Sequence, residues 1–191
     1  MQTTRYLEDK AREVRSLMLK MANFGKAEGA HLGPALSLAD IVTVLFFSAM
    51  NYKSDDPNNP ERDRFILSKG HGVLALYAPL AVAGFYPEEE TATFVGKNTR
   101  LAGHPSSLEL GGLEHPAGSL GHGLSVGCGL AKAAKLDGKD YRTYVVLGDG
   151  EINEGSVWEA VMFAKQHGLD NLLAVVDKNG FQYGGTTEQL M

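Results

Sequence analysis

The chain has 191 residues, of which 43% are hydrophobic and 21% are charged, a composition typical of a soluble globular protein. Its net charge of −5 gives no general attraction to nucleic acid or to an anionic membrane, so we expect neither as a partner. With the single cysteine Cys128, no internal disulfide can form, and neither a signal peptide nor an apolar run of about 18 residues is evident. We therefore expect a cytoplasmic protein in which residues 1–191 form a single domain.

Hydrophobic periodicity predicts the elements of the first half of the chain. They are, in order, an amphipathic helix (6–23), a Gly- and Pro-rich loop (29–34), a mostly apolar helix with Ser37 as its N-cap (38–50), a buried strand (65–68), a Gly-flanked polar turn (69–72) and a helix (73–83). In an open parallel sheet, ligands bind at turns that follow a strand in this way.

The second half begins with a long irregular stretch, residues 100–123, whose small and apolar residues argue against disorder. Such a stretch inside a compact domain is usually functional. The elements expected after it are a helix (124–135), a buried strand (144–147), a helix that ends near His167 and a second buried strand (172–176). The last strand is at the edge of a small sheet, and something else is expected to cover it.

Two polar residues follow the two buried strands of the second half. Asp149 and Asn179 lie just past the strand ends, and a crossover helix returns the chain between them, so we expect both at the same edge of a parallel sheet. A carboxylate and an amide carbonyl suit a hard cation such as Mg²⁺ or Ca²⁺. Gly148 and Gly150 allow the backbone to approach a ligand, and the following helix offers free N–H groups to an anion. The pattern predicts a metal–diphosphate site.

Histidines are concentrated in the loops. Five of the six lie in Gly- or Pro-rich segments, namely His31, His71, His104, His115 and His122. If these loops converge at one sheet edge, the imidazoles suit proton transfer or the binding of polyhydroxylated and phosphorylated ligands. A transition-metal site is a weaker alternative because zinc-ligand spacings are absent. His167 is expected at a helix C-terminus, where it interacts favourably with the helix dipole.

Five segments together resemble one family, the thiamine-diphosphate-binding N-terminal part of transketolase, in the version split into N- and C-terminal subunits. The segments are Gly-Ala-His-Leu-Gly (29–33), Asp-Arg-Phe-Ile-Leu-Ser-Lys-Gly-His-Gly (63–72), Gly-His-Pro (103–105), Gly-Ser-Leu-Gly-His-Gly (118–123) and Gly-Asp-Gly with a later Asn (148–179). The resemblance implies an α/β fold: a parallel sheet with helices on both faces, short at its C-terminal end relative to the family.

The resemblance also implies a role for each matching residue. Metal ligands would be Asp149, the Asn179 side chain and the Phe181 carbonyl, holding Mg²⁺, Ca²⁺ or Mn²⁺. The cofactor would be bound by His71, Gly118, Ser119, Leu120, Gly148, Gly150, Glu151 and Asn179, with Gly150 and Glu151 acting through their backbone. Catalytic histidines would be His31, His71 and His104, which bind sugar hydroxyls and move protons. Glu154 matches a carboxylate that links two active sites across a dimer.

The implied reaction is the transfer of a two-carbon ketol unit from a ketose phosphate to an aldose phosphate, with thiamine diphosphate as cofactor. The glutamate that activates the cofactor belongs to a pyrimidine-binding domain that this chain lacks. The expected partner is therefore a C-terminal transketolase subunit, and the expected assembly is a dimer of heterodimers. Two departures from the family are His122, where Gln is common, and the end of the chain soon after Asn179, which leaves a further family histidine without a counterpart.

Three other functions compete with this interpretation. The chain could be a non-catalytic binding or assembly module that keeps the fold. It could belong to another thiamine-diphosphate enzyme, such as a 1-deoxyxylulose-5-phosphate synthase or the α chain of a 2-oxoacid dehydrogenase, although segments 69–72 and 103–105 fit transketolase better. A generic nucleotide-binding Rossmann domain is the weakest alternative because no G-x-G-x-x-G follows a strand.

Overall fold

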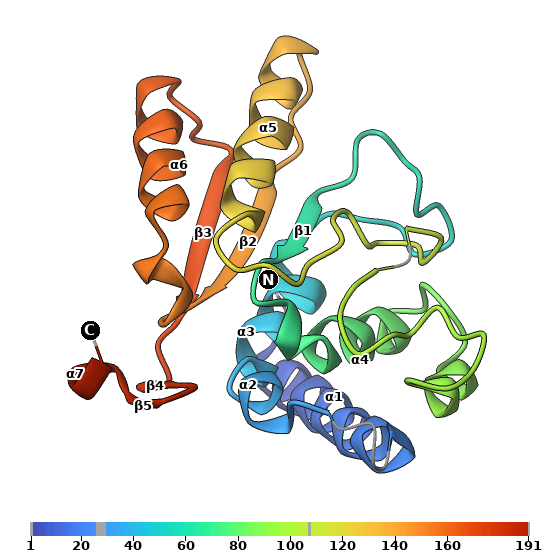
Figure 1. The fold of residues 1–191 in the computed structure, drawn as a ribbon. Coiled ribbons are helices and arrows are strands. Elements are labelled where there is room, and N and C mark those ends of the chain that lie inside the picture. Colours follow the sequence, from blue (N-terminus) through green and yellow to red (C-terminus); the bar gives the residue numbers. More distant parts are fainter. Residues whose placement is uncertain (1, 26–29, 107, 191) are drawn as a thin grey trace.

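The computed structural model describes residues 2–25, 30–106 and 108–190, and a three-stranded parallel sheet lies at its centre (Figure 1). Strands β1 (Arg64–Leu67), β2 (Thr143–Gly148) and β3 (Leu172–Asp177) are ordered β1-β2-β3. The register places Gly148 opposite Asp177, so the carboxyl ends of β2 and β3 lie level. The predicted parallel sheet is confirmed.

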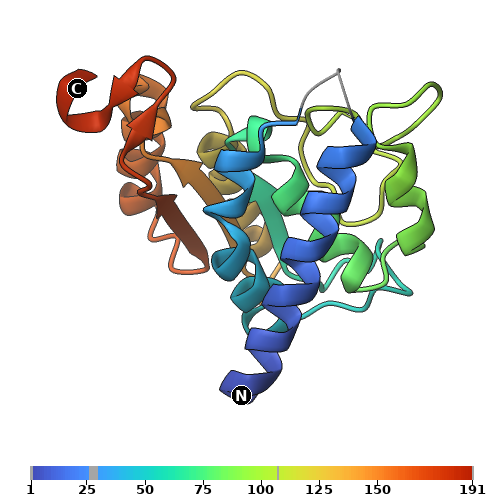
Figure 2. The same cartoon turned by 90° about the horizontal axis from the view of Figure 1, so that it is seen from below.

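Helices cover both faces of this sheet, as predicted (Figures 1 and 2). Helices α1 (Thr4–Gly25), α3 (Ala39–Val44) and α4 (Leu74–Val82) lie on one face, and α5 (Gly123–Leu136) and α6 (Gly155–Gln166) on the other. Successive side chains of a strand point to opposite faces of the sheet, so alternate strand residues pack into the hydrophobic clusters on the two faces. Phe65, Leu67, Tyr144 and Val146 join the first cluster, whereas Ile66, Val145 and Leu147 join the second.

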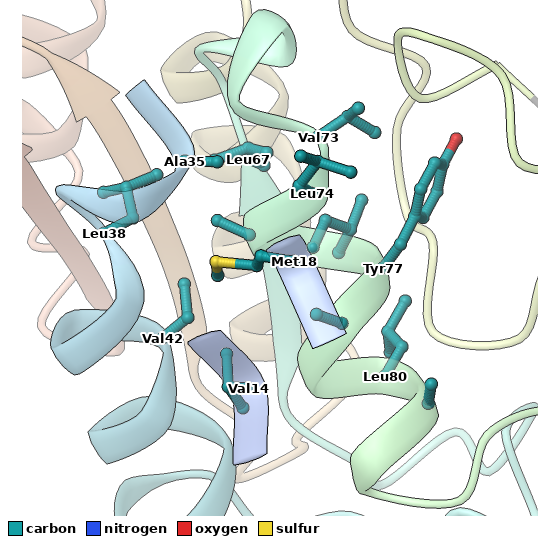
Figure 3. Close-up of a cluster of buried hydrophobic side chains, with 14 of the residues drawn as sticks. Val14, Met18, Ala35, Leu38, Val42, Leu67, Val73, Leu74, Tyr77 and Leu80 are labelled. Atoms are coloured by element: carbon teal, nitrogen blue, oxygen red, sulfur yellow. The ribbon is translucent and has the colours of Figure 1, made fainter. Parts of the chain in front are cut away.

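The larger cluster forms where α1 and α4 pack against β1 and the segment around α3 (Figure 3). Val14 and Met18 of α1 are fully buried there, as is Tyr77 of α4. Helix α4 is buried on nearly every side, which explains why its sequence is apolar throughout rather than amphipathic. This packing fixes the turn between β1 and α4, where His71 lies.

Three predictions for the segment after α1 are wrong in detail. The stretch predicted as a loop overlaps helix α2 (Leu32–Leu36), and the helix predicted over 38–50 is divided into α3 and a π-helical turn, η2 (Leu45–Ala49). Ser37 is not an N-cap, because its backbone is helical (φ −60°, ψ −28°) whereas a cap residue adopts an extended conformation. Gly29, the first residue of the 29–33 motif, lies outside the described residues.

The remaining described elements are short. They are the 3₁₀ turns η3 (Gly70–Gly72), η4 (Glu88–Thr93) and η5 (Glu151–Asn153), the antiparallel pair β4 (Phe181–Gln182) and β5 (Gly185–Thr186), and helix α7 (Thr187–Leu190). Within residues 101–122, the described positions contain no helix or strand, as predicted. No helix in the described part of the chain is long and apolar enough to span a membrane.

One side of the molecule exposes an apolar surface over α6 and β3. Four large apolar side chains of α6 are exposed, and so are two large apolar side chains of β3. These residues are Trp158, Val161, Met162, Phe163, Leu173 and Val176. We call this set the α6–β3 surface. Among the described residues, β3 pairs only with β2, so its outer edge is open, as the sequence predicted for the last strand.

Candidate functional site

The turns that follow β2 and β3 meet at the carboxyl edge of the sheet. The N–H of Asp149 donates to the Asp177 carbonyl (3.3 Å), and the N–H of Gly180 donates to Asp149 Oδ2 (2.8 Å). The structure thus brings the Asp149 carboxylate against the loop that carries Asn179. This juxtaposition follows from the parallel register, which ends both strands at the same level.

Hydrogen bonds orient both candidate metal ligands. Asp149 is 8% exposed, and its Oδ1 accepts from the N–H of Gly150 (2.9 Å). Asn179 Nδ2 donates to Asp177 Oδ2 (3.4 Å), and its Oδ1 accepts from the N–H of Phe181 (2.9 Å). The turns therefore hold the carboxylate and the amide oxygen in fixed orientations, in two loops that contact each other through the Gly180 N–H.

The donor set fits a hard divalent cation. Within the described ranges, no group of three or more His, Cys, Asp or Glu side chains could hold a metal ion. The candidate site contains only one such side chain, Asp149, which the Asn179 amide oxygen and a main-chain carbonyl would complete. An all-oxygen set of this kind suits Mg²⁺ or Ca²⁺ and not zinc, which takes nitrogen and sulfur ligands.

The surroundings of Gly150 fit an anion. Helix α6 begins at Gly155, after the 3₁₀ turn η5, so its free N–H groups lie one short turn beyond Gly150. A side-chain donor is also present. A Cβ added to Gly150 would lie 3.0 Å from the Gln182 side chain, whose Nε2 is buried without a hydrogen-bond partner. A phosphate oxygen would satisfy this donor.

The loop 117–123 packs against the turn that follows β1. A Cβ added to Gly70 would lie 2.7 Å from the Ala117 carbonyl oxygen, so this close approach requires glycine. Gly118 and Ser119 are exposed and Leu120 is half-buried, so the segment predicted to contact the cofactor rings lies at the surface.

Three of the five loop histidines form a cluster. The His31 ring lies 5.9 Å from that of His71 and 6.0 Å from that of His104, centroid to centroid. The pKa of His71 is lowered to about 4, chiefly by burial and also by the charges of Lys69, His31 and His104. This cluster therefore contains an imidazole that stays neutral at physiological pH.

The other three histidines make different contacts. Burial lowers the pKa of His115, and nearby His122 contributes in the same direction, so these two are neighbours. Among the described aromatic contacts, neither ring touches the His31–His71–His104 cluster. Ring contacts thus join three of the five loop histidines, and His115 and His122 form a separate pair. His167 caps the C-terminus of α6 and packs against Phe163 (4.2 Å between centroids).

Acid is expected to destabilise the protein through His71. In the unfolded chain a histidine binds its proton near pH 6.5, whereas folded His71 binds it near pH 4. Between pH 6.5 and pH 4, His71 is therefore protonated in the unfolded chain but not in the folded protein. Because the unfolded state binds the additional proton, the free energy of unfolding falls as the pH decreases from about 6.5 to about 4. Urea unfolding at several pH values should show a shallower decline for His71→Gln than for the exposed control His167→Gln. Equal slopes would contradict the assignment.

A family model described as transketolase, thiamine diphosphate binding domain, matches residues 8–191. The chain belongs to this family. Membership excludes the generic Rossmann domain considered above, and it agrees with the five motifs on which the resemblance rests.

Relatives within the transketolase family include proteins named as transketolase subunits. The chain is 49% identical over 166 residues to an apulose-4-phosphate transketolase subunit of Phocaeicola vulgatus, covering 87% of this chain and 59% of that protein. It is 39% identical over 184 residues to the 6-deoxy-6-sulfo-D-fructose transketolase subunit SqwG of a Clostridium species, covering 96% and 66%. The chain thus spans about three fifths to two thirds of the length of these relatives.

Solved transketolases share the fold. The transketolase of Campylobacter jejuni superposes on the whole chain with a TM-score of 0.92 at 30% identity, and the match covers 31% of that protein. The transketolase of Leishmania mexicana gives a TM-score of 0.89 at 32% identity, with 29% of its length covered. The predicted fold class is therefore confirmed.

Sequence reasoning missed a buried ion pair in this transketolase domain. Lys69 Nζ, on a residue 1% exposed, lies 2.7 Å from Asp177 Oδ2. The same oxygen accepts from Ser37 Oγ (2.5 Å) and from Asn179 Nδ2. The pair therefore joins the turn after β1 to the candidate metal-binding loop. A lysine directly after a buried strand was the available signal, but its partner is 108 residues away.

Proposed function

We propose that this chain is the cofactor-binding subunit of a two-subunit transketolase, with residues 1–191 as one thiamine-diphosphate-binding domain. The observation that carries the proposal is the contact of the Asp149 carboxylate with the Asn179 loop, through the 2.8 Å hydrogen bond from Gly180. Oxygen ligands from two adjacent turns suit a cation that bridges phosphates. Family membership supports thiamine diphosphate as the molecule that carries those phosphates.

The proposed site divides into a cation part and an anion part. Asp149, Asn179 and the Phe181 carbonyl would hold Mg²⁺, and the backbone of Gly148, Gly150 and Glu151 would face the diphosphate, together with the unpartnered Gln182 Nε2. The segment 118–120, which lies at the surface, would lie along the cofactor rings. Bound thiamine diphosphate supplies the nucleophilic carbon and takes up the electrons of the broken C–C bond.

The His31–His71–His104 cluster would handle the sugar. With a pKa of about 4, His71 is neutral at pH 7, so a ring nitrogen is free to accept a hydrogen bond from a sugar hydroxyl. The exposed His31 and His104 rings flank it and can donate to other sugar oxygens. The cluster is thus suited to proton transfer during transfer of a two-carbon ketol unit between sugar phosphates.

A second protein completes the proposal. This partner subunit would carry the pyrimidine-binding domain and the glutamate that activates the cofactor, and two such pairs would form a dimer of heterodimers in the cytoplasm. Similar proteins that are named as transketolase subunits support a two-chain enzyme. The exposed α6–β3 surface supports burial against protein, since soluble monomers rarely expose contiguous apolar patches.

The test is reconstitution with a C-terminal transketolase subunit from the same genome. We expect ketol transfer that requires both proteins, thiamine diphosphate and Mg²⁺, and no turnover by either protein alone. The sugars tested as ketol donors should include apulose 4-phosphate and 6-deoxy-6-sulfofructose, which appear in the names of the relatives, and unmodified ketose phosphates. Absence of transfer with every donor, together with no metal-dependent cofactor binding, would favour the non-catalytic module instead.

A further inference from the structure

The Glu151 side chain makes contacts that its proposed backbone role does not require. It is 2% exposed, although it lies in the turn directly after Gly150. Oε1 accepts from the Ser68 hydroxyl and from the N–H of Gly121 (2.9 Å), and Oε2 accepts from the N–H of Gly148 (3.0 Å). The carboxylate therefore points into the protein.

Its three donors come from three different segments. Ser68 directly follows β1, Gly121 belongs to the loop 117–123, and Gly148 ends β2. A fourth bond extends the network, because the N–H of Gly123 donates to Ser68 Oγ (3.1 Å). The segments joined in this way are those that carry His71, the 118–120 segment and Asp149, which together make up most of the candidate cofactor site.

The chemistry of the network requires a carboxylate. Both oxygens face donors, and only a group that accepts at both positions satisfies all three bonds. In glutamine, an NH₂ group would replace one of the two oxygens. This NH₂ group and the donor that faces it could not form a hydrogen bond with each other. Bonds to an ionised acceptor are also shorter and roughly twice as strong as neutral ones, which offsets the cost of burying the charge.

The backbone of the loop also depends on the network. Gly121 has φ +84°, a backbone conformation that favours glycine. A Cβ at this position would lie 2.6 Å from Ser156 Oγ, so there is also no space for a side chain. The Gly121 carbonyl accepts from that same Ser156 hydroxyl (2.9 Å). Together with the bond to Glu151, this contact holds both the N–H and the carbonyl of Gly121.

We propose that Glu151 is a positioning residue whose carboxylate holds the three cofactor-site loops in register and does not itself touch the cofactor. The inference rests on the proposed function for the identity of the ligand. Its structural part, the holding of the loops, stands on the hydrogen bonds alone. Glu151 would then act on cofactor affinity through Gly148 and Gly121, the neighbours of Asp149 and of the 118–120 segment.

The test compares Glu151→Gln with wild type by hydrogen exchange and by calorimetric titration with thiamine diphosphate and Mg²⁺. We expect exchange at the Gly121 and Gly148 amides to accelerate about 10-fold or more while core amides in α4 change less. We also expect cofactor affinity, measured with the partner subunit present, to fall about 10- to 100-fold, the usual cost of losing a supporting partner.

Controls separate positioning from general destabilisation. Glu89→Gln removes an exposed carboxylate and should match wild type in both readouts. Val14→Ala opens a cavity in the core far from the network, and it should lower global stability without selective exchange at Gly121 and Gly148. If Glu151→Gln does not fold, Ser68→Ala serves as the test variant because it removes only one hydrogen-bond donor. It should change amide exchange and cofactor affinity in the same directions, by smaller amounts.

Two outcomes would overturn the inference. One is unchanged exchange at Gly121 and Gly148 in Glu151→Gln, and the other is a loss of affinity no greater than that of Val14→Ala. If wild type itself shows no metal-dependent cofactor binding, the proposed function fails. The exchange data would then still decide whether Glu151 holds the loops.

Discussion

Replacing Asp149 with alanine is expected to abolish metal-dependent binding of thiamine diphosphate. Asp149 is the one charged side chain in the candidate metal-ligand set, and the remaining amide and carbonyl oxygens cannot neutralise a divalent cation. We expect affinity to fall by about 100-fold or more, since loss of mere outer-shell partners already costs roughly 10- to 100-fold. Calorimetry with and without Mg²⁺, in the presence of the partner subunit, measures the change.

Asp149 also has a structural role, so the experiment needs an isosteric variant. Its carboxylate accepts from the N–H groups of Gly150 and Gly180, and alanine would leave both donors without that partner. Asp149→Asn keeps the size and one acceptor while removing the charge, and Asp55→Ala is a matched exposed control. If Asp149→Asn folds normally and retains metal-dependent binding, the assignment of the metal site is wrong.

Lys69→Met is expected to be among the most destabilising single substitutions in this domain. The change removes the ammonium and leaves the Asp177 carboxylate, which is 5% exposed, with only neutral donors from Ser37 and Asn179. Breaking one side of a buried ion pair typically costs about 3–5 kcal/mol. Urea denaturation should show this loss as a lower transition midpoint at an unchanged slope.

A double-mutant cycle identifies the cause of this loss. Replacing both partners, Lys69→Met with Asp177→Leu, removes the uncompensated charge, so the double variant should be more stable than Lys69→Met alone. Lys53→Met, at an exposed lysine, is the matched control and should have little effect. If the double variant loses the sum of the two single losses, the pair is not coupled and the argument fails.

The candidate site was predictable where it depends on local sequence and strand order. Asp149 and Asn179 each follow a buried apolar run, and parallel strands bring such positions to one edge, so their proximity required no knowledge of side chains. The helix predicted between the last two strands is also confirmed, as α6, which begins at Gly155 after the 3₁₀ turn η5. The division of the helix predicted over 38–50 was missed because nothing in its apolar sequence distinguishes the π-helical turn η2 from a further α-helical turn.

Contacts between distant segments could not be predicted. Lys69 pairs with Asp177, and Glu151 binds Ser68 and Gly121, across separations of 30 to 108 residues. Periodicity reports only which face of an element is buried, not which polar group on another element meets it. The same limit explains why the ring contacts among His31, His71 and His104 could not be singled out from the five loop histidines.

The sequence alone determined the family, the parallel sheet with helices on both faces, and the turns that carry the candidate ligands, because apolar runs and glycine-flanked motifs are local patterns. The tertiary structure decided how those turns are held. It placed the charges of Lys69 and Glu151 behind the site, each satisfied by groups from other segments, and it lowered the pKa of His71 by burial. These features depend on distance and desolvation in the folded chain, which exist only after the layers pack together.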